Sequence, residues 1–408
     1  MPELYIHLHS YRRTGIFIIR RRVFQFIRLL PRMAVRFPKR SFFMTTTRPY
    51  ALRLFLSACA VMTLAACAGP VTAPPQSSRT EIQQETLKQQ SLLFERHVAD
   101  SGRIFALSYP LMVANAEFCR PRTSPTVGAT VWNIYGLKGN AQTIARQAYG
   151  LGPRLALRDV VRNSPAARAG LRAGDVLIAI NGQNLPANAK AAQIAENLVK
   201  QSGMRPVDIV FERGGRAQST VMQPVEGCNY PVILDSNSNE INAYADGQKI
   251  VISRGIVRFS ENDNEVAMVI AHELGHSALL HVNKMRQNAT VGSLGGLAID
   301  SLLAAAGVST GGAATQMGGQ MALQQYSVPF EQEADYVGMY FMERAGYNTS
   351  NVANFWRRMG AENARSINTR TTHPTSVERF LAIERTYAEI QSKKRAGQQL
   401  VPNMQQRR

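Results

Sequence analysis

Two histidines one helical turn apart, His272 and His276, constrain this chain more than any other feature; they lie in the apolar run NEVAMVIAHELGHSALLH. Because each residue of an α-helix turns by about 100°, both imidazoles face the same side and can ligate one metal ion. Zinc favours such nitrogen ligands. Glu273, offset around the helix, is suited to take a proton from a metal-bound water. The alternative is a buried helix whose histidines are only core residues.

The third metal ligand has to come from elsewhere in the chain. A longer histidine motif would require Gly at position 279 and His at position 282, but the chain has Leu279 and Val282 there. His281 comes one residue too early, and on a continuous helix it points away from the other two histidines. We therefore expect His281 to be a surface or second-layer residue.

A second helical segment, FEQEADYVGMYFMERAG, offers carboxylates instead. Glu331 and Asp335 are one turn apart on it, and the apolar run that follows indicates a buried helix, in which a carboxylate needs a partner. We predict that Glu331 completes a zinc site with the two histidines, and that Asp335 hydrogen-bonds a ligand histidine. Glu333 is expected on a solvated face.

The order of these motifs resembles a known family, the HtpX-like zinc metalloendopeptidases (gluzincins), which include the CAAX prenyl proteases and BepA-type periplasmic proteins. Four elements carry the likeness: HELGH, the ExxAD helix at Glu331, the pair His373-Pro374, and Arg379-Phe380. The likeness covers residues 235 to about 387. It implies a mainly helical zincin domain with a small β-sheet and one Zn²⁺ per chain, in which Glu273 activates the water that hydrolyses a peptide bond.

The resemblance also makes His373 a candidate catalytic residue, because a histidine in the family's His-Pro motif approaches the zinc. It would stabilise the oxyanion or occupy the open metal position; the alternative is a capping histidine that does not contact metal. The strand in KIVISRGIV is a predicted edge for an extended polypeptide substrate. A second functional hypothesis stays open: a chaperone or scaffold for envelope proteins that keeps this fold without hydrolysis.

Residues 127–227 form a separate predicted unit. The segment VVRNSPAARAGLRAGDVLIAINGQNL resembles a PDZ domain of the bacterial protease-associated type, which binds extended peptides by adding a strand to a sheet. Tyr149-Gly150-Leu151-Gly152 stands where the carboxylate-binding loop is expected. Pro153, which follows, has no amide hydrogen, so the loop departs from the simple pattern. A PDZ domain that serves only as a spacer or lid is the alternative.

The first 80 residues carry a predicted export signal. Residues 1–43 are too charged to cross a bilayer and are interpreted as a non-native extension ahead of Met44, with an amphipathic surface helix as the alternative. Residues 44–66 have the basic start and short apolar core of a signal peptide, and Leu64-Ala65-Ala66-Cys67 is similar to a lipobox. We predict lipidation of Cys67, a tether over 67–80, and a periplasmic location at the outer membrane. A plain signal peptide is the alternative.

Two further cysteines fit an oxidising compartment. Cys119 and Cys228 bracket the PDZ-like unit and would remain after the signal peptide, with Cys59, is removed and Cys67 is lipidated. Leftover thiols in such a compartment tend to pair, so we predict a disulfide between Cys119 and Cys228. Two separate buried thiols are the alternative.

The net charge of +19 does not indicate a nucleic-acid partner. Residues 1–66 hold 12 of the 47 basic residues and a single acid, Glu3, and the remainder has no concentrated basic stripe. The partners that we predict are polypeptide substrates, a membrane reached through the lipid anchor, and a peptide ligand of the PDZ-like unit.

Taken together, the patterns predict an α+β multidomain protein. A helical segment over 81–126 packs on the body, the PDZ-like unit spans 127–227, the zinc metallopeptidase domain spans 228–390, and 391–408 form a basic disordered tail. The Gly- and Ala-rich stretch 290–321 contains Asp300 and no long apolar run, which indicates short helices and a mobile lid rather than a membrane span. The sequence leaves the oligomeric state open.

Overall fold

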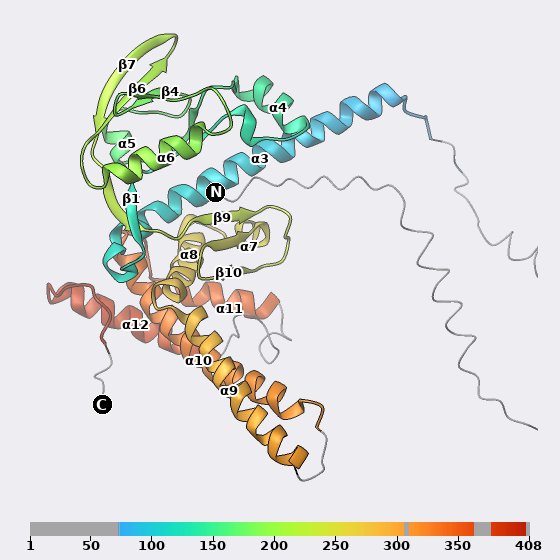
Figure 1. The fold of residues 1–408 in the computed structure, drawn as a ribbon, viewed down its shortest axis with the longest axis vertical. Helices are drawn as coiled ribbons and strands as arrows, with labels where there is room; N and C mark the ends of the chain where they lie inside the picture. Colours follow the sequence, from blue (N-terminus) through green and yellow to red (C-terminus); the bar gives the residue numbers. More distant parts are fainter. Residues whose placement is uncertain (1–71, 73, 306–309, 363–376, 405–408) are drawn as a thin grey trace, which may run out of the picture. The chain divides into compact units, whose positions relative to one another are not determined.

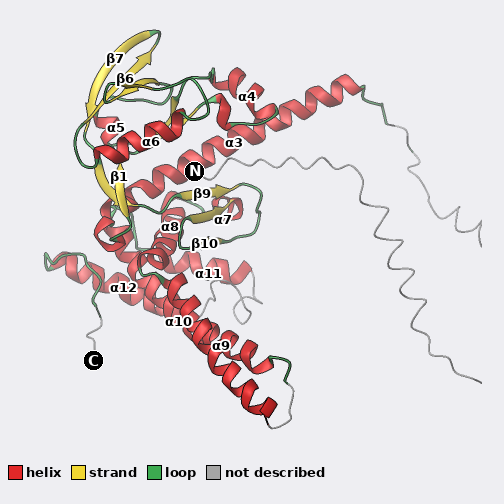
Figure 2. Ribbon diagram, viewed as in Figure 1, coloured by secondary structure: helices red, strands yellow, loops and turns green. Residues whose placement is uncertain are grey.

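The structure is a computed structural model that describes residues 72, 74–305, 310–362 and 377–404 (Figures 1 and 2). The chain divides into two compact units, Met1–Thr86 and Leu87–Arg408. Residues 1–66, Cys67 and His373 lie outside the described residues, so the export signal, the lipidation and the role of His373 stay predictions. Among the described helices, none combines the length and apolarity that crossing a membrane requires.

The first described helix is α3 (Arg79–Ala114). Its start has a capping box: the Ser78 hydroxyl accepts from the Glu81 amide at 3.2 Å, and the Glu81 carboxylate accepts from the Ser78 amide at 2.7 Å. From Leu87 onward, the helix buries Phe94, Ile104 and further apolar side chains. The 3₁₀ turn η1 (Ala116–Cys119) and strand β1 (Thr123–Thr126) follow. The predicted helical segment therefore ends in a strand.

The PDZ-like unit is an antiparallel sheet with helices and its own apolar core. The sheet runs in the order β2-β3-β4-β6-β7, with β5 on β4, and all its pairs are antiparallel. Its elements are β2 (Ala129–Trp132), η2 (Ile134–Gly136), α4 (Asn140–Tyr149), β3 (Ala156–Val160), α5 (Pro165–Arg168), β4 (Val176–Ile180), β5 (Gln183–Asn184), α6 (Ala191–Ser202), β6 (Val207–Arg213) and β7 (Arg216–Met222). Leu155, Ile180, Val207 and Phe211 belong to the core.

A disulfide closes the chain around this unit. Cys119 is bonded to Cys228, 109 residues later, with a Cα–Cα distance of 5.4 Å. Beside the bond, β1 pairs antiparallel with β8 (Val225–Cys228), and Thr123 is opposite Cys228. The two cysteines predicted to pair are bonded in the structure, and both ends of the PDZ-like unit leave it at the same place.

The C-terminal part is mainly helical with one small sheet, which confirms the predicted α+β class. The strands β9 (Val232–Asp235), β10 (Ala243–Ala245) and β11 (Ile250–Ser253) are ordered β10-β11-β9. The helices are α7 (Arg254–Phe259), α8 (Asp263–Ala278), α9 (His281–Ala305), α10 (Ala313–Arg344), α11 (Val352–Glu362) and α12 (Val377–Arg395). Because β11 is the central strand, the prediction that KIVISRGIV supplies an open edge is wrong. Among the described strands of this sheet, β10 lies at the edge, and its Tyr244 is exposed.

Two long helices replace the short helices expected over 290–321. Figure 1 shows α9 and α10 as a hairpin, and they approach closely: a Cβ added at Gly296 would lie 2.0 Å from the carbonyl oxygen of Ala314. The Asp300 carboxylate accepts from the amides of Ala314 and Thr315 at 3.1 and 2.8 Å and from the Thr310 hydroxyl. An α9 side chain thus caps the first turn of α10.

The prediction that residues 391–408 are disordered is wrong for the part that the structure describes, which extends to residue 404. Helix α12 continues to Arg395, and Pro402 is buried after it. Lys393 donates to the carbonyl of Val401 at 2.7 Å, and Arg344 donates to the carbonyl of Leu400 at 3.3 Å. These hydrogen bonds hold the tail against the folded part. The basic composition of the tail, on which the prediction was based, does not show which carbonyls its neighbouring cations will bind.

Candidate metal centre

Helix α8 is buried along most of its length. It begins with the Asn262 side chain accepting from the Glu265 amide at 3.2 Å, and its residues from Val266 to Ser277 are buried. Two glycines let α10 approach it: a Cβ at Gly275 would lie 3.1 Å from the Ala334 carbonyl oxygen, and one at Gly338 would lie 3.2 Å from the Cα of His272. This close packing brings the α10 carboxylates to the α8 histidines.

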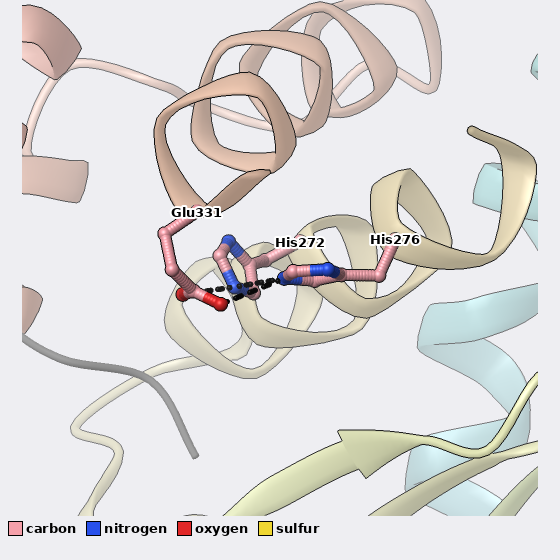
Figure 3. Close-up of side chains that lie close together, drawn as sticks. All are labelled: His272, His276 and Glu331. Atoms are coloured by element: carbon pink, nitrogen blue, oxygen red, sulfur yellow. Dashed lines mark hydrogen bonds and ion pairs between the residues drawn. The ribbon is translucent and has the colours of Figure 1, made fainter. Parts of the chain in front are cut away.

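The structure brings His272, His276 and Glu331 together (Figure 3). The Nε2 atoms of the two histidines are 3.1 Å apart, and the two Glu331 oxygens lie 3.3 Å from Nε2 of His272 and 3.2 Å from Nε2 of His276. Ligand atoms ~2.0–2.1 Å from a tetrahedral zinc ion are about 3.3 Å apart. The nitrogen and oxygen donors therefore have the spacing and chemistry that a zinc ion requires.

The charges around the cluster favour a cation. Glu273, Glu331 and Asp335 are buried, with one buried guanidinium, Arg379, among them. Counted with both imidazoles neutral, as metal ligands must be, these described residues carry three negative charges and one positive charge, and this excess in a region shielded from water needs compensation. A divalent cation supplies that compensation.

Asp335 and Arg379 hold the first histidine. Asp335 Oδ1 lies 2.9 Å from Nδ1 of His272, and Arg379 donates to both Asp335 oxygens at 2.7 and 2.9 Å. Arg379 also lies 3.3 Å from Glu331 and 4.9 Å from the centre of the Trp356 ring. The predicted role of Asp335 fits this geometry, because an Nδ1–H that donates to Asp335 leaves Nε2 of His272 directed at the cluster.

Burial and the carboxylates act in opposite directions on the two histidines. Burial opposes a charge on His272, but the hydrogen bonds and charges of Asp335 and Glu331 outweigh it and raise its pKa to about 10. Burial dominates at His276 and lowers its pKa. The pKa of Asp335 is lowered, because the Arg379 charge and its bonds overcome the effect of burial.

Two predictions near the centre hold in part: His281 lies in the second layer but points toward His276, and Glu333 is half-exposed but has a partner. His281 is completely buried, and its Nδ1 lies 3.1 Å from Nδ1 of His276. Glu333, expected to be merely solvated, lies 3.0 Å from Nε2 of His281. The sequence signal for this contact was the third histidine in HELGHSALLH, whose direction depends on where the helix ends.

The predicted PDZ loop lies at a cavity of about 490 Å³. Tyr149 ends α4, and the cavity is lined by Gly150, Leu151 and Gly152 together with Val98 of α3. Strand β3, which follows the loop, is paired on both edges at Ala156, with Trp132 of β2 and Val176 of β4. The loop therefore does not lead into an open strand edge; among the described strands, β2 ends the sheet on this side.

Sequence comparison identifies both folded parts. Residues 214–387 match peptidase family M48, and residues 157–213 match the PDZ domain. A solved HtrA3 PDZ domain bound to a phage-derived ligand (FGRWV) is 17% identical and covers 26% of this chain and 88% of its own, with a TM-score of 0.20.

Relatives with named activities are similar over part of the chain. The beta-barrel assembly-enhancing protease of Escherichia coli K12 is 30% identical over 30% of this chain and 27% of its own length. The metalloprotease LoiP of the same organism is 30% identical over 38% of this chain and 60% of its own, and the mitochondrial metalloendopeptidase OMA1 of Schizosaccharomyces pombe is 28% identical over 36% and 44%. The chain spans 27% of the assembly-enhancing proteases that it matches in Yersinia pestis and E. coli.

Proposed function

Because the chain carries a domain of peptidase family M48 beside a PDZ domain, we propose that it is a zinc-dependent metalloendopeptidase acting on extended or misfolded envelope polypeptides. The observation that carries this proposal is the convergence of two imidazole nitrogens and a carboxylate at distances of 3.1–3.3 Å. Glu273, the residue after the first of these histidines, is the general base, and structural zinc sites do not require one.

The catalytic roles follow from the donor set. His272, His276 and Glu331 would hold zinc, which when bound lowers the pKa of a water molecule to near 7 and polarises the scissile carbonyl. Glu273 takes the proton of the attacking water and passes it to the leaving amine nitrogen. His373 is proposed to stabilise the developing oxyanion.

Substrate binding is proposed at the edge of the small sheet. Among the described strands, β10 lies at the edge of this sheet beside β11, and it carries the exposed Tyr244. An extended polypeptide can add there through backbone hydrogen bonds, which selects unfolded segments over folded ones.

The experiment compares the wild-type chain with Glu273→Gln. Glutamine keeps the size of the side chain but cannot accept the proton, so we expect zinc content to stay at one per chain while casein cleavage is lost. Purified protein without zinc, or equal cleavage by both proteins, would overturn the proposal. A scaffold without hydrolysis would bind casein equally in both forms and cleave it in neither.

We also propose that Cys67 is lipidated and anchors the protein at the periplasmic face of the outer membrane. The lipobox-like sequence supports this anchor, and the similarity to the E. coli beta-barrel assembly-enhancing protease supports envelope β-barrel proteins as substrates. Incorporation of labelled palmitate into the wild type but not into Cys67→Ser is the expected result. Equal labelling of both proteins would exclude this anchor.

The PDZ domain is proposed to bind a peptide, with Tyr149, Gly150, Leu151 and Gly152 as the candidate loop. The loop lines a cavity, which supports this assignment, but among the described strands β2 ends the sheet on this side. Peptide titration of the wild type and Leu151→Asp tests the loop, since a charge at this buried position should abolish binding there. Unchanged affinity in a folded variant would move the site to β2.

A further inference from the structure

A second chain of contacts continues from the metal cluster through His276. Nδ1 of His276 lies 3.1 Å from Nδ1 of His281, and Nε2 of His281 lies 3.0 Å from Oε2 of Glu333. His281 is 0% exposed, whereas the Glu333 side chain is 47% exposed. This series of contacts therefore begins at the buried cluster and ends at the protein surface.

A break between two helices directs His281 toward His276. Helix α8 ends at Ala278, and Leu280 has a φ of +56° before α9 begins at His281. On an unbroken helix, residues five apart lie about 140° apart around the axis and do not meet. The left-handed Leu280 is strained for a residue with a Cβ, and such strain is concentrated at functional positions.

Helix α10 holds the other side of the His281 ring. Phe330 stacks on it with ring centres 4.6 Å apart and planes 25° apart, and Glu333 follows one turn later on the same helix. Glu331, the candidate metal ligand, lies between these two residues in the sequence. One turn of α10 thus contacts both the metal cluster and the histidine behind it.

The carboxylate of Glu333 fixes the direction of each hydrogen bond in this series of contacts. An ionised Glu333 only accepts, so Nε2 of His281 must donate to it. A neutral His281 then has a lone pair on Nδ1, which accepts the Nδ1–H of His276. That tautomer leaves the lone pair of His276 on Nε2, the atom that lies 3.1 Å from Nε2 of His272.

We propose that His281 and Glu333 are positioning residues that fix the tautomer and ring orientation of His276 for metal binding. The inference rests on the proposed zinc site, but it concerns how that site is held and not whether it hydrolyses peptides. Partners of ligand histidines of this kind change metal affinity by about 10- to 100-fold when removed.

The test measures zinc affinity of the full chain by competition with a chelator. His281→Phe keeps the ring and its stacking on Phe330 but removes the acceptor, so we expect affinity to fall by about 10- to 100-fold. His281→Asn places an amide oxygen near the position of Nδ1 and should recover much of the loss. Glu333→Ala, at a half-exposed position that folding tolerates, should lower affinity in the same direction.

The matched control is Glu384→Gln. Glu384 is 51% exposed and ion-paired with Arg357 at 2.6 Å, so it resembles Glu333 in exposure and pairing but lies on α12 in a pair with α11. Its variant should bind zinc like the wild type. Wild-type affinity in both His281→Phe and Glu333→Ala would overturn the positioning role, as would a His281→Asn variant no better than His281→Phe.

The outcomes also separate this inference from the proposed function. If the wild type binds zinc but cleaves no substrate, the proposed peptidase activity is excluded and the positioning role can still be tested. A wild type that binds no zinc removes both. Thermal unfolding of the metal-free variants shows whether a loss of affinity comes from a loss of fold.

Discussion

The two histidines of the cluster are held in different ways. His272 contacts Asp335, which is itself paired with Arg379, and all three are buried. His276 contacts a second histidine, and the chain of contacts ends on the half-exposed Glu333. The first arrangement, the His272 arm, places formal charges in the interior. The second, the His276 arm, places a histidine ring in the interior and leaves the carboxylate at the surface.

The comparison shows that two ligand histidines can be oriented by contacts whose loss has different effects on stability. Buried charges stabilise only while every partner is present, because each is expensive to leave uncompensated. A carboxylate at the surface remains hydrated when its partner is lost. The His272 arm should therefore be sensitive in both stability and metal affinity, whereas the His276 arm should be sensitive mainly in metal affinity.

The largest effect is expected from Arg379→Met. It removes the guanidinium that pairs with Asp335 at 2.7 Å and leaves buried carboxylates uncompensated. Breaking one partner of such a pair costs about 3–5 kcal/mol, which we expect in the free energy of unfolding of the metal-free chain from urea titration. Arg357→Met, which breaks the exposed pair with Glu384, should cost less than about 1 kcal/mol. Equal losses in both variants would contradict the contrast.

The next effect concerns Asp335→Asn. His272 has a pKa of about 10 against an ordinary value of 6.5, so its charged form stabilises the metal-free chain fully below pH 6.5, and this contribution is lost as the pH rises toward 10. Asparagine removes the main partner, so the decline in unfolding free energy over this range should become shallower. Zinc affinity should fall by about 10- to 100-fold. An unchanged pH profile would show that Asp335 does not hold the proton on His272.

The residues of the cluster could be predicted from the sequence because their spacing along each helix is a local feature. The four-residue spacing of His272 and His276, and of Glu331 and Asp335, fixes which side chains share a helix face. The PDZ-like unit was similarly readable from its turn residues, such as Ser164, whose side chain accepts from the Ala167 amide.

What the sequence did not predict depends on where elements end and on which neighbours they meet. His281 was placed away from His276 because a continuous helix was assumed, and Leu280 breaks it. Strand β11 is central because β9 pairs with it in parallel, a long-range choice that its apolar pattern does not encode. The fold-back of the tail onto Arg344 is likewise a tertiary contact.

A smaller effect should appear at Leu280, which sets the direction of the His276 arm. Glycine adopts its φ of +56° without a Cβ clash, whereas alanine does not. We expect Leu280→Gly to exceed Leu280→Ala in unfolding free energy by about 1 kcal/mol, with zinc affinity close to wild type in the glycine variant. At an ordinary helical position the glycine variant is less stable than the alanine variant by about 0.5–1 kcal/mol. If Leu280→Gly is the less stable of the two, the strained turn is excluded.

The smallest effect tests whether the His276 arm depends on the α9–α10 hairpin, since His281 begins α9 and Glu333 lies in α10. Hydrogen bonds from Thr310 and Thr315 lower the pKa of Asp300 to about 2, so its carboxylate stabilises the hairpin above pH 3.8, and this contribution is lost as the pH falls through 2. Asp300→Asn should imitate that loss at neutral pH. We expect faster hydrogen exchange at the start of α10 and a fall in zinc affinity smaller than that of His281→Phe. Faster exchange with unchanged affinity would show that the base of the hairpin holds His281 without help from its far end, and the His276 arm would then be as self-contained as the His272 arm.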